Sequence, residues 1–273
     1  MRIYVTSRNR TVDSASPSDF RFFLERPIEL AENAKGYLDS FVCSNTWETI
    51  IAGVNDKLYV QWNVSVPRIL TLDPGTIIDN ADLATKLTTG LAALDPTMKT
   101  VTVTAIGTNR IQFDCPTLIG AEQFTVYSRE NLRRGYAPYA TASDYADASD
   151  VVGCMTKQLV CYFNSNPQVN AAVVAISQFV SFAPYRQIYI HSHIGAPNSY
   201  GPEGSSTVIG SMIVGNTIPG DLISHHHQGL LATSIDLPPL LDSMHFTLRD
   251  FMGRIIDTDG HDISFSLVVD NNI

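Results

Sequence analysis

Histidines offer the most distinctive chemistry in this sequence of 273 residues. His225, His226 and His227 are consecutive, whereas His191 and His193 are two residues apart, so a strand would project both from one face. Paired imidazoles can bind zinc or copper. Three consecutive side chains cannot all point at one ion, however, and no thiolate or carboxylate cluster lies beside them. We therefore treat these five histidines as weak metal candidates and expect neither a metal nor a cofactor. A polar loop and a half-exposed strand face explain them equally simply.

The cysteines and the absence of catalytic motifs argue against an enzyme. Cys43, Cys115, Cys154 and Cys161 have no C-x-x-C spacing and lie in apolar or strand-like runs. Free cysteines of this kind are usually small buried core residues, and they favour a reducing compartment. The sequence contains no G-x-S-x-G, G-x-x-x-x-G-K-[ST] or H-E-x-x-H motif. We expect a protein without catalytic activity.

Arginines and tyrosines form a second set of candidate residues, suited to protein contacts. The interface candidates are Arg2, Arg8 and Arg10 near the N-terminus, and Arg133, Arg134, Tyr136, Tyr139 and Tyr145 in an irregular segment. Tyrosine and arginine are enriched among the residues that dominate interface energetics. The irregular segment is therefore predicted to contact another protein, with a sugar-binding platform or a plain ordered loop as alternatives.

The composition restricts the class of partner. Charged residues make up only 16% of the chain, and 18 basic against 27 acidic residues give a net charge of −9. A net-acidic chain is a poor general binder of nucleic acid or anionic lipid. A surface with so few charges is typical of β-rich proteins and of faces buried against a partner. With no membrane-length apolar run and no signal-peptide core, we expect a protein kept in the cytosol or released by assembly or lysis.

The elements that must position these residues are mostly strands. Alternating apolar patterns predict strands within 19–30, 37–51, 58–64, 100–104, 110–115, 123–127, 159–163, 173–182, 187–194, 207–214, 230–236, 245–249 and 262–269. One helix is predicted after Asp79 or Asn80, with Leu83, Leu87, Leu91 and Leu94 on one face. Residues 66–128 would form a compact unit around that helix. The turn at 259–260 is expected to pair the strand of Phe246 with that of Phe265. The pattern indicates an all-β sandwich or barrel.

The order of several short motifs resembles the penton and minor capsid proteins of double-stranded DNA viruses in the jelly-roll lineage, such as virophages, polinton-like viruses and large algal and protist viruses. The N-terminal motifs are Ser7-Arg8-Asn9-Arg10, Ser18-Asp19-Phe20-Arg21-Phe22, Arg26-Pro27-Ile28-Glu29-Leu30 and Trp47-Glu48-Thr49-Ile50. A short motif of this family is similar to Leu72-Asp73-Pro74-Gly75-Thr76, although the family usually has an aromatic residue at the position of Thr76. The later motifs are Ile188-Tyr189-Ile190-His191-Ser192, the run 208–214, the run 246–253 and the run 257–265.

The resemblance implies a jelly-roll β-sandwich with one amphipathic helix in an inserted α+β unit. The expected organisation is an N-terminal arm over 1–17, the jelly roll over 18–65 and 129–273, and the inserted unit over 66–128. It also implies a structural virion protein of the capsid, a penton or minor capsid protein at icosahedral vertices, assembled in the host cell.

The partners that the resemblance implies begin with further copies of the chain, in a homopentamer. The major capsid protein and other minor capsid proteins would be its neighbours. The N-terminal arm could contact an internal membrane or the genome, and a host receptor is a further candidate partner. The alternative function is a β-sandwich module that binds a host glycan or receptor, as in a virion spike or lectin. A metal-dependent hydrolase or oxidase built on the histidines is a third hypothesis.

Overall fold

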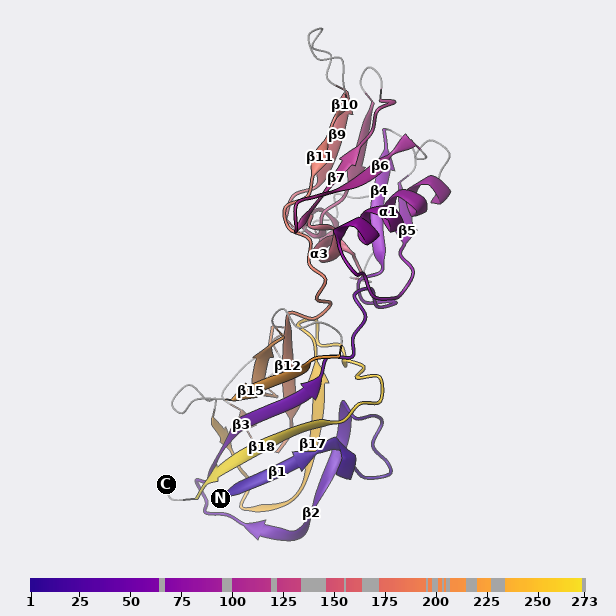
Figure 1. Cartoon of the computed structure of the whole chain (residues 1–273). Helices are drawn as coiled ribbons and strands as arrows, with labels where there is room; N and C mark the ends of the chain where they lie inside the picture. Colours follow the sequence, from indigo (N-terminus) through magenta and orange to yellow (C-terminus); the bar gives the residue numbers. More distant parts are fainter. Residues whose placement is uncertain are drawn as a thin grey trace. The chain divides into compact units, whose positions relative to one another are not determined.

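The chain forms two compact units in the computed structural model. The first contains Met1–Trp47 and Tyr185–Ile273, and the second, Glu48–Pro184, is inserted into it. The structure describes residues 1–63, 67–94, 100–118, 122–133, 146–154, 156–163, 172–194, 196–197, 201–202, 204, 207–214, 220–226 and 234–271. Each unit has its own sheets, which can be followed by label in Figure 1.

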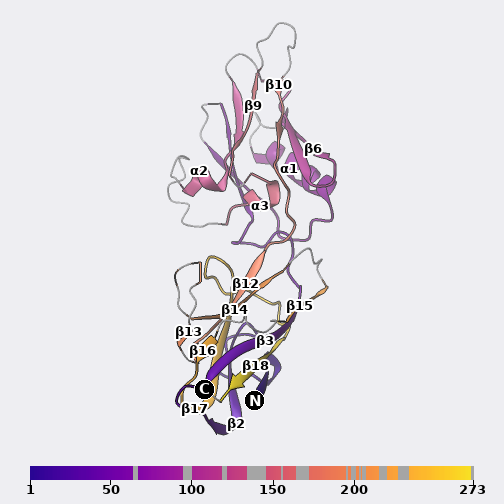
Figure 2. The same ribbon diagram turned by 90° about the vertical axis from the view of Figure 1, so that its left-hand side faces the viewer.

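The first unit is a sandwich of two antiparallel sheets. One orders β1 (Arg2–Thr6), β18 (Ile263–Asp270), β3 (Lys35–Ser44), β16 (Ser234–Asp236) and β13 (Ala196–Pro197), with β15 (Leu222–His226) also paired to β3. The other orders β14 (Val208–Ile213), β12 (Gln187–Ser192), β17 (Leu240–Arg249) and β2 (Asp19–Glu29). The chain passes from one sheet to the other at β1–β2, β2–β3 and β17–β18, as a jelly roll requires. Figure 2 shows the strands of both sheets from the side. The predicted all-β jelly-roll class is confirmed.

The N-terminal residues belong to this sandwich and do not form a free arm over 1–17. β1 pairs antiparallel with β18 from Arg2 opposite Val268 to Thr6 opposite Ser264, and the short 3₁₀ helix η1 (Ser7–Asn9) follows it. Ile3 and Val5 are buried, so the alternating pattern of this segment reflects one core-facing side. The amino group of Met1 also donates a hydrogen bond of 2.7 Å to the Val269 carbonyl oxygen.

The predicted pairing of the last two long strands is wrong. β17 and β18 lie in opposite sheets, and residues 250–262 between them cross from one sheet to the other. Phe246 of β17 and Phe265 of β18 instead meet inside the sandwich, with ring centroids 4.7 Å apart and planes at 80°. Two strands with buried faces and a turn between them look alike in sequence whether they share a sheet or face each other.

The inserted unit combines two further sheets with helices. Its five-stranded sheet orders β10 (Ala172–Val173), β9 (Leu159–Phe163), β8 (Gln123–Val126), β4 (Lys57–Trp62) and β5 (Arg68–Thr71). Its three-stranded sheet orders β11 (Ala175–Ile176), β7 (Arg110–Asp114) and β6 (Thr102–Ile106). The helices are α1 (Asn80–Leu94), α2 (Arg129–Arg133) and α3 (Ser149–Val152).

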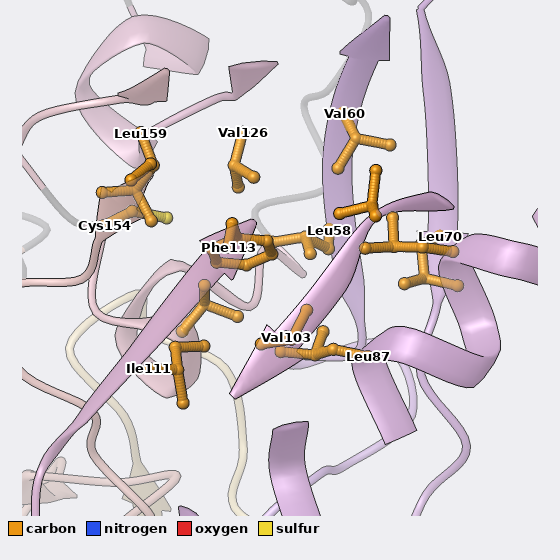
Figure 3. Packing of buried hydrophobic residues seen from close by; sticks show 14 of the residues in the cluster. Leu58, Val60, Leu70, Leu87, Val103, Ile111, Phe113, Val126, Cys154 and Leu159 are labelled. Carbon is orange, nitrogen blue, oxygen red and sulfur yellow. The ribbon is translucent and has the colours of Figure 1, made fainter. Parts of the chain in front are cut away.

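The predicted helix is confirmed as α1. The Asp79 side chain caps it, accepting hydrogen bonds from the backbone N–H groups of Ala81 at 2.9 Å and Asp82 at 2.8 Å. Leu83, Leu87 and Leu91 are completely buried. They join a core that includes Leu70 of β5 and Val103 of β6, as Figure 3 shows for Leu70, Leu87 and Val103. The leucine stripe therefore packs α1 against β5 and β6, the strands that precede and follow it along the chain.

The inserted unit extends beyond the expected range of 66–128 at both ends. β4 and β9 were assigned by sequence to the jelly roll, within 18–65 and 129–273, but both pair with β8. Their buried residues, such as Leu58, Val60 and Leu159, belong to the core of the inserted unit. Alternation identifies a strand and its buried face, but it carries no information on which of two sheets the strand joins.

Candidate assembly surface

The outer face of the six-stranded sheet carries a group of serine and threonine hydroxyl side chains. Inward positions of its strands are apolar, so the alternate positions face outward. We call these outward residues the serine face: Arg2, Tyr4 and Thr6 of β1, Ser264, Ser266 and Val268 of β18, Tyr37, Asp39, Ser40, Val42 and Ser44 of β3, and Leu222, Ser224 and His226 of β15. Within this patch the charged side chains are Arg2 and Asp39, whereas Lys35, Asp236 and Asp270 lie opposite one another at one end of the same sheet face.

The polar groups of the serine face satisfy one another. The hydroxyl groups of Ser40 and Ser266 are 2.7 Å apart, and Ser266 also donates to Asp39 Oδ2 at 3.0 Å. The Asp39 carboxylate lies 3.2 Å from the Arg2 guanidinium, whose pKa is raised by a hydrogen bond with Tyr4 and by the charge of Asp39. Groups that already have partners lose little when water is removed. This face is therefore suited to burial against a partner.

Two large exposed side chains and a hollow interrupt this polar face. Tyr4 is 72% exposed and Leu222 67% exposed, although both lie on strands whose other side is core. A hollow of about 310 Å³ is lined by Tyr4, Val5, Thr6, Asn9, Ser40, Val42, Ser264 and Phe265. An exposed aromatic side chain beside a hollow is the kind of feature that anchors a protein interface.

The outer face of the four-stranded sheet carries a second set of charged and aromatic side chains. His245 of β17 is 2.7 Å from Asp19 of β2, and its ring stacks on His193 with centroids 6.4 Å apart. Arg21 lies opposite His245 on β2 and is 3.6 Å from Asp13. Phe23, two residues further along β2, is 59% exposed. The two outer faces of the sandwich therefore differ in chemistry, and they point in opposite directions.

The structure separates the histidines that were weak metal candidates. His191 and His193 lie at the end of β12 in the four-stranded sheet, and His191 Nδ1 is 2.9 Å from Thr207 Oγ1. His225 and His226 lie on β15 in the other sheet, and His227 is outside the described residues. Within the described part of the chain, no three His, Cys, Asp or Glu side chains are grouped to hold a metal.

The arginine and tyrosine candidates have mixed outcomes. Arg2 is on the serine face, Arg8 is exposed in η1, and Arg10 donates to the Ser7 carbonyl oxygen at 2.9 Å and lies 3.3 Å from Asp262. Arg2 and Arg10 thus have partners in the jelly roll, whereas Arg8 is exposed. Arg133 ends α2, while Arg134, Tyr136, Tyr139 and Tyr145 lie outside the described residues, so their predicted contact role stays a prediction.

A buried cluster of charged side chains around Arg129 in the inserted unit was not predicted. Arg129 Nε is 3.0 Å from Asp147 Oδ2, and its Nη1 is 2.9 Å from Asp150 Oδ2. Burial alone would lower the pKa of Arg129, but the two carboxylates outweigh it and raise that pKa above the ordinary value. The cluster ties the start of α2 to α3 across the segment between them. Its only sequence signal was an arginine followed at a distance by aspartates, which specifies no pairing.

These features define an all-β jelly-roll protein with an inserted α+β unit and a hydroxyl-bearing patch on one outer face. The chain is similar to the selenomethionine-labelled mavirus penton protein. Its crystal structure aligns over 99% of both chains, with a TM-score of 0.51 and 11% sequence identity. No family model and no curated protein matches the sequence. In the described part of the chain, no helix has the length and apolar character needed to cross a membrane. The likeness establishes a shared fold.

Proposed function

We propose that this chain is a structural virion protein, a penton or related minor capsid protein at the icosahedral vertices of a double-stranded DNA virus. The observation that carries the proposal is the end-to-end likeness to the mavirus penton protein, which covers 99% of each chain. The motif order along the sequence supports the same conclusion. In this role the chain has no catalytic activity, resides in the capsid, and contacts major and minor capsid proteins.

The two outer faces of the jelly roll supply a means of forming a closed ring. A cyclic homopentamer needs two different, complementary patches on each copy. The serine face provides a hollow beside Tyr4, and the opposite outer face provides the exposed Phe23. Because the serine face has few charges and internally paired hydroxyls, its burial costs little in desolvation. We therefore assign the serine face of one copy to the Phe23 side of the next.

The first test is the mass of the purified protein in solution. Light scattering after size exclusion, over a range of protein and salt concentrations, should give a mass close to five chains. A monomer at every concentration would contradict the homopentamer, and a glycan array would then test the receptor-binding alternative.

A matched pair of variants tests the assigned face. Tyr4→Glu removes the exposed aromatic ring and places a carboxylate on the serine face, and it should raise the concentration needed for assembly at least about tenfold. Ile78→Glu makes the same kind of change at a site in the inserted unit that is 83% exposed, and assembly should be unaltered. Both variants should keep the circular dichroism of the wild type. Equal assembly of the two variants would remove the serine face from the interface.

A further inference from the structure

The four cysteines divide into two isolated thiols and one pair. All four are buried as free thiols. Cys43, in the jelly roll, and Cys154, in the inserted unit, each have a pKa raised to about 12 by burial. Cys115 and Cys161 are also completely buried, but their side chains interact directly with each other. Of the four cysteines, Cys115 and Cys161 are therefore the two that are placed to react with each other.

Several groups converge on the Cys161 sulfur atom. It lies 3.4 Å from the carbonyl oxygen of Phe113, two residues before Cys115. The Cys115 thiol and the backbone N–H of Ala175 both donate hydrogen bonds to it. Ala175 is paired with Phe113 in the three-stranded sheet, so β11 and the end of β7 enclose this atom together. Cys161 belongs to β9 of the five-stranded sheet, which means that the contact bridges two sheets.

The hydrogen bond makes the two thiols unequal. Donation from Cys115 lowers the pKa of Cys161, whereas the same bond raises the pKa of Cys115. Cys161 is thus the more acidic member of the pair, and the thiolate is the form that attacks a disulfide. Cys43 and Cys154 have no such thiol partner, and burial, the largest influence on the pKa of each, disfavours their thiolates.

We propose that Cys115 and Cys161 are an oxidation site, at which a small-molecule disulfide such as oxidised glutathione converts the two thiols into one disulfide bond. The Cys161 thiolate attacks the oxidant, forms a mixed disulfide and releases one glutathione thiolate. The Cys115 thiolate then attacks the Cys161 sulfur and releases the second. Two protons and two electrons leave the protein, and one oxidised glutathione becomes two reduced molecules. The reaction proceeds through local opening of the buried core.

The bond would cross-link the two sheets of the inserted unit through its interior. A disulfide that closes a long loop stabilises the folded state, chiefly by restricting the unfolded chain. A protein made in a reducing cytosol would therefore gain stability in this unit after it reaches an oxidising exterior. The inference goes beyond the proposed function and does not depend on it, because it concerns only the core of the inserted unit.

Thiol counting and peptide mapping test the site in the folded wild-type protein. The protein is incubated with oxidised glutathione without denaturant, the oxidant is removed, and the protein is then denatured; maleimide labelling should fall from four thiols per chain to two. Mass mapping without reduction should find the peptides of Cys115 and Cys161 joined, with a mass two hydrogens lower. The unfolding temperature of the inserted unit should rise by roughly 10 °C.

Variants at each class of cysteine sharpen this test. Cys115→Ala and Cys161→Ala should each abolish the cross-link, whereas Cys43→Ala and Cys154→Ala should retain it. Four thiols remaining after prolonged oxidation would overturn the proposal, as would pairing through Cys43 or Cys154. A cross-link that forms only in urea would also overturn it. Because mapping uses the wild type, a variant that fails to fold does not prevent a decision.

Discussion

The jelly roll and the inserted unit are both β-rich, but they stabilise their cores in different ways. In the jelly roll, Phe20, Phe246 and Phe265 pack between the two sheets, with ring centroids 4.7 to 6.5 Å apart. In the inserted unit, the leucines of α1 seal one side of a largely aliphatic core. Aromatic contacts between sheets occur in both units, since the rings of Phe113 and Phe124 lie 6.0 Å apart in the second, but the inserted unit adds a helix and a buried ion cluster to them.

The two tryptophans allow this difference to be measured in one chain. Trp47 lies in the jelly roll, where its indole N–H donates to the Asp257 carbonyl oxygen at 2.6 Å. Trp62 lies in the inserted unit, 6.2 Å from the ring of Phe124. Fluorescence of a Trp62→Phe protein therefore reports unfolding of the jelly roll, and that of a Trp47→Phe protein reports the inserted unit. Each stability variant can be measured in both of these single-tryptophan proteins.

The largest effect is expected from Phe265→Asp in the jelly roll. The change removes an aromatic side chain that is 3% exposed and buries an unpaired carboxylate between Phe20 and Phe246. The cost should exceed about 5 kcal/mol, which is comparable to the whole stability of many domains. Urea titration should show an unfolded jelly roll by Trp47 fluorescence, with a retained transition for Trp62.

Ser264→Asp is the matched control for this prediction. Ser264 is exposed on the same strand, so below the concentration needed for assembly its replacement should change stability by less than about 0.5 kcal/mol. A folded Phe265→Asp protein would show that the aromatic contacts do not hold the sheets together. Loss of both transitions would show that the inserted unit depends on the jelly roll for its own fold.

The second effect is expected from Arg129→Ala in the inserted unit. The change leaves Asp147, which is 2% exposed, and the partly buried Asp150 without their shared arginine. Removing one partner of a buried ion pair typically costs about 3 to 5 kcal/mol. The urea midpoint of Trp62 should fall accordingly, and that of Trp47 should stay unchanged.

The surface pair between Lys86 and Asp82 provides the comparison. Its atoms are 3.5 Å apart one helical turn along α1, and Lys86 is 41% exposed. Lys86→Ala should cost no more than about 0.5 kcal/mol, because exposed pairs contribute little. Similar losses in Arg129→Ala and Lys86→Ala would mean that the buried cluster has no special part in holding α2 to α3.

Local patterns in the sequence predicted individual elements better than their arrangement. The leucine spacing and the Asp79 cap identified α1, and alternation located strands such as β2, β4 and β7, because these signals depend on near neighbours along the chain. Pairing between distant segments left no such signal. β4 and β9 were therefore assigned to the wrong unit, and β1 was taken for an arm although Ile3 and Val5 alternate inward.

The same limit applies to the candidate surface. Arg2 was selected for its charge, but its partner Asp39 and the paired hydroxyls of Ser40 and Ser266 could not be identified without the register of β1, β18 and β3. The irregular spacing around Arg129 likewise gave no reason to expect Asp147 and Asp150 as its partners. The low overall charge gave no indication of which sheet carries these hydroxyl groups, whereas the strand register specifies it.

A third, smaller effect should follow from Leu87→Ala in α1. Leu87 is completely buried in the inserted unit, and truncation of a buried leucine costs about 2 to 5 kcal/mol; we expect about 3. Thr89→Ala, at an exposed position two residues away, should be neutral or slightly stabilising, since alanine favours helix. The Trp62 transition should register the difference. Equal midpoints for the two variants would contradict the assignment of the leucine stripe to the core.

The smallest effect is a loss of jelly-roll stability at alkaline pH that can be assigned to Tyr185. Burial raises the pKa of Tyr185 to about 12, with the nearby Asp250 adding to the shift, whereas an exposed tyrosine in the unfolded chain ionises near 10. The unfolded state therefore loses the phenolic proton first, so this contribution to stability is complete below pH 10 and disappears as pH rises to 12. At pH 11 the loss should be about 1 kcal/mol.

Cys43, whose pKa is also raised to about 12, adds a component that Tyr185→Phe leaves in place. The difference in the Trp47 urea midpoint between wild type and Tyr185→Phe should thus change between pH 9 and pH 11, and a constant difference would mean that Tyr185 ionises equally easily in both states.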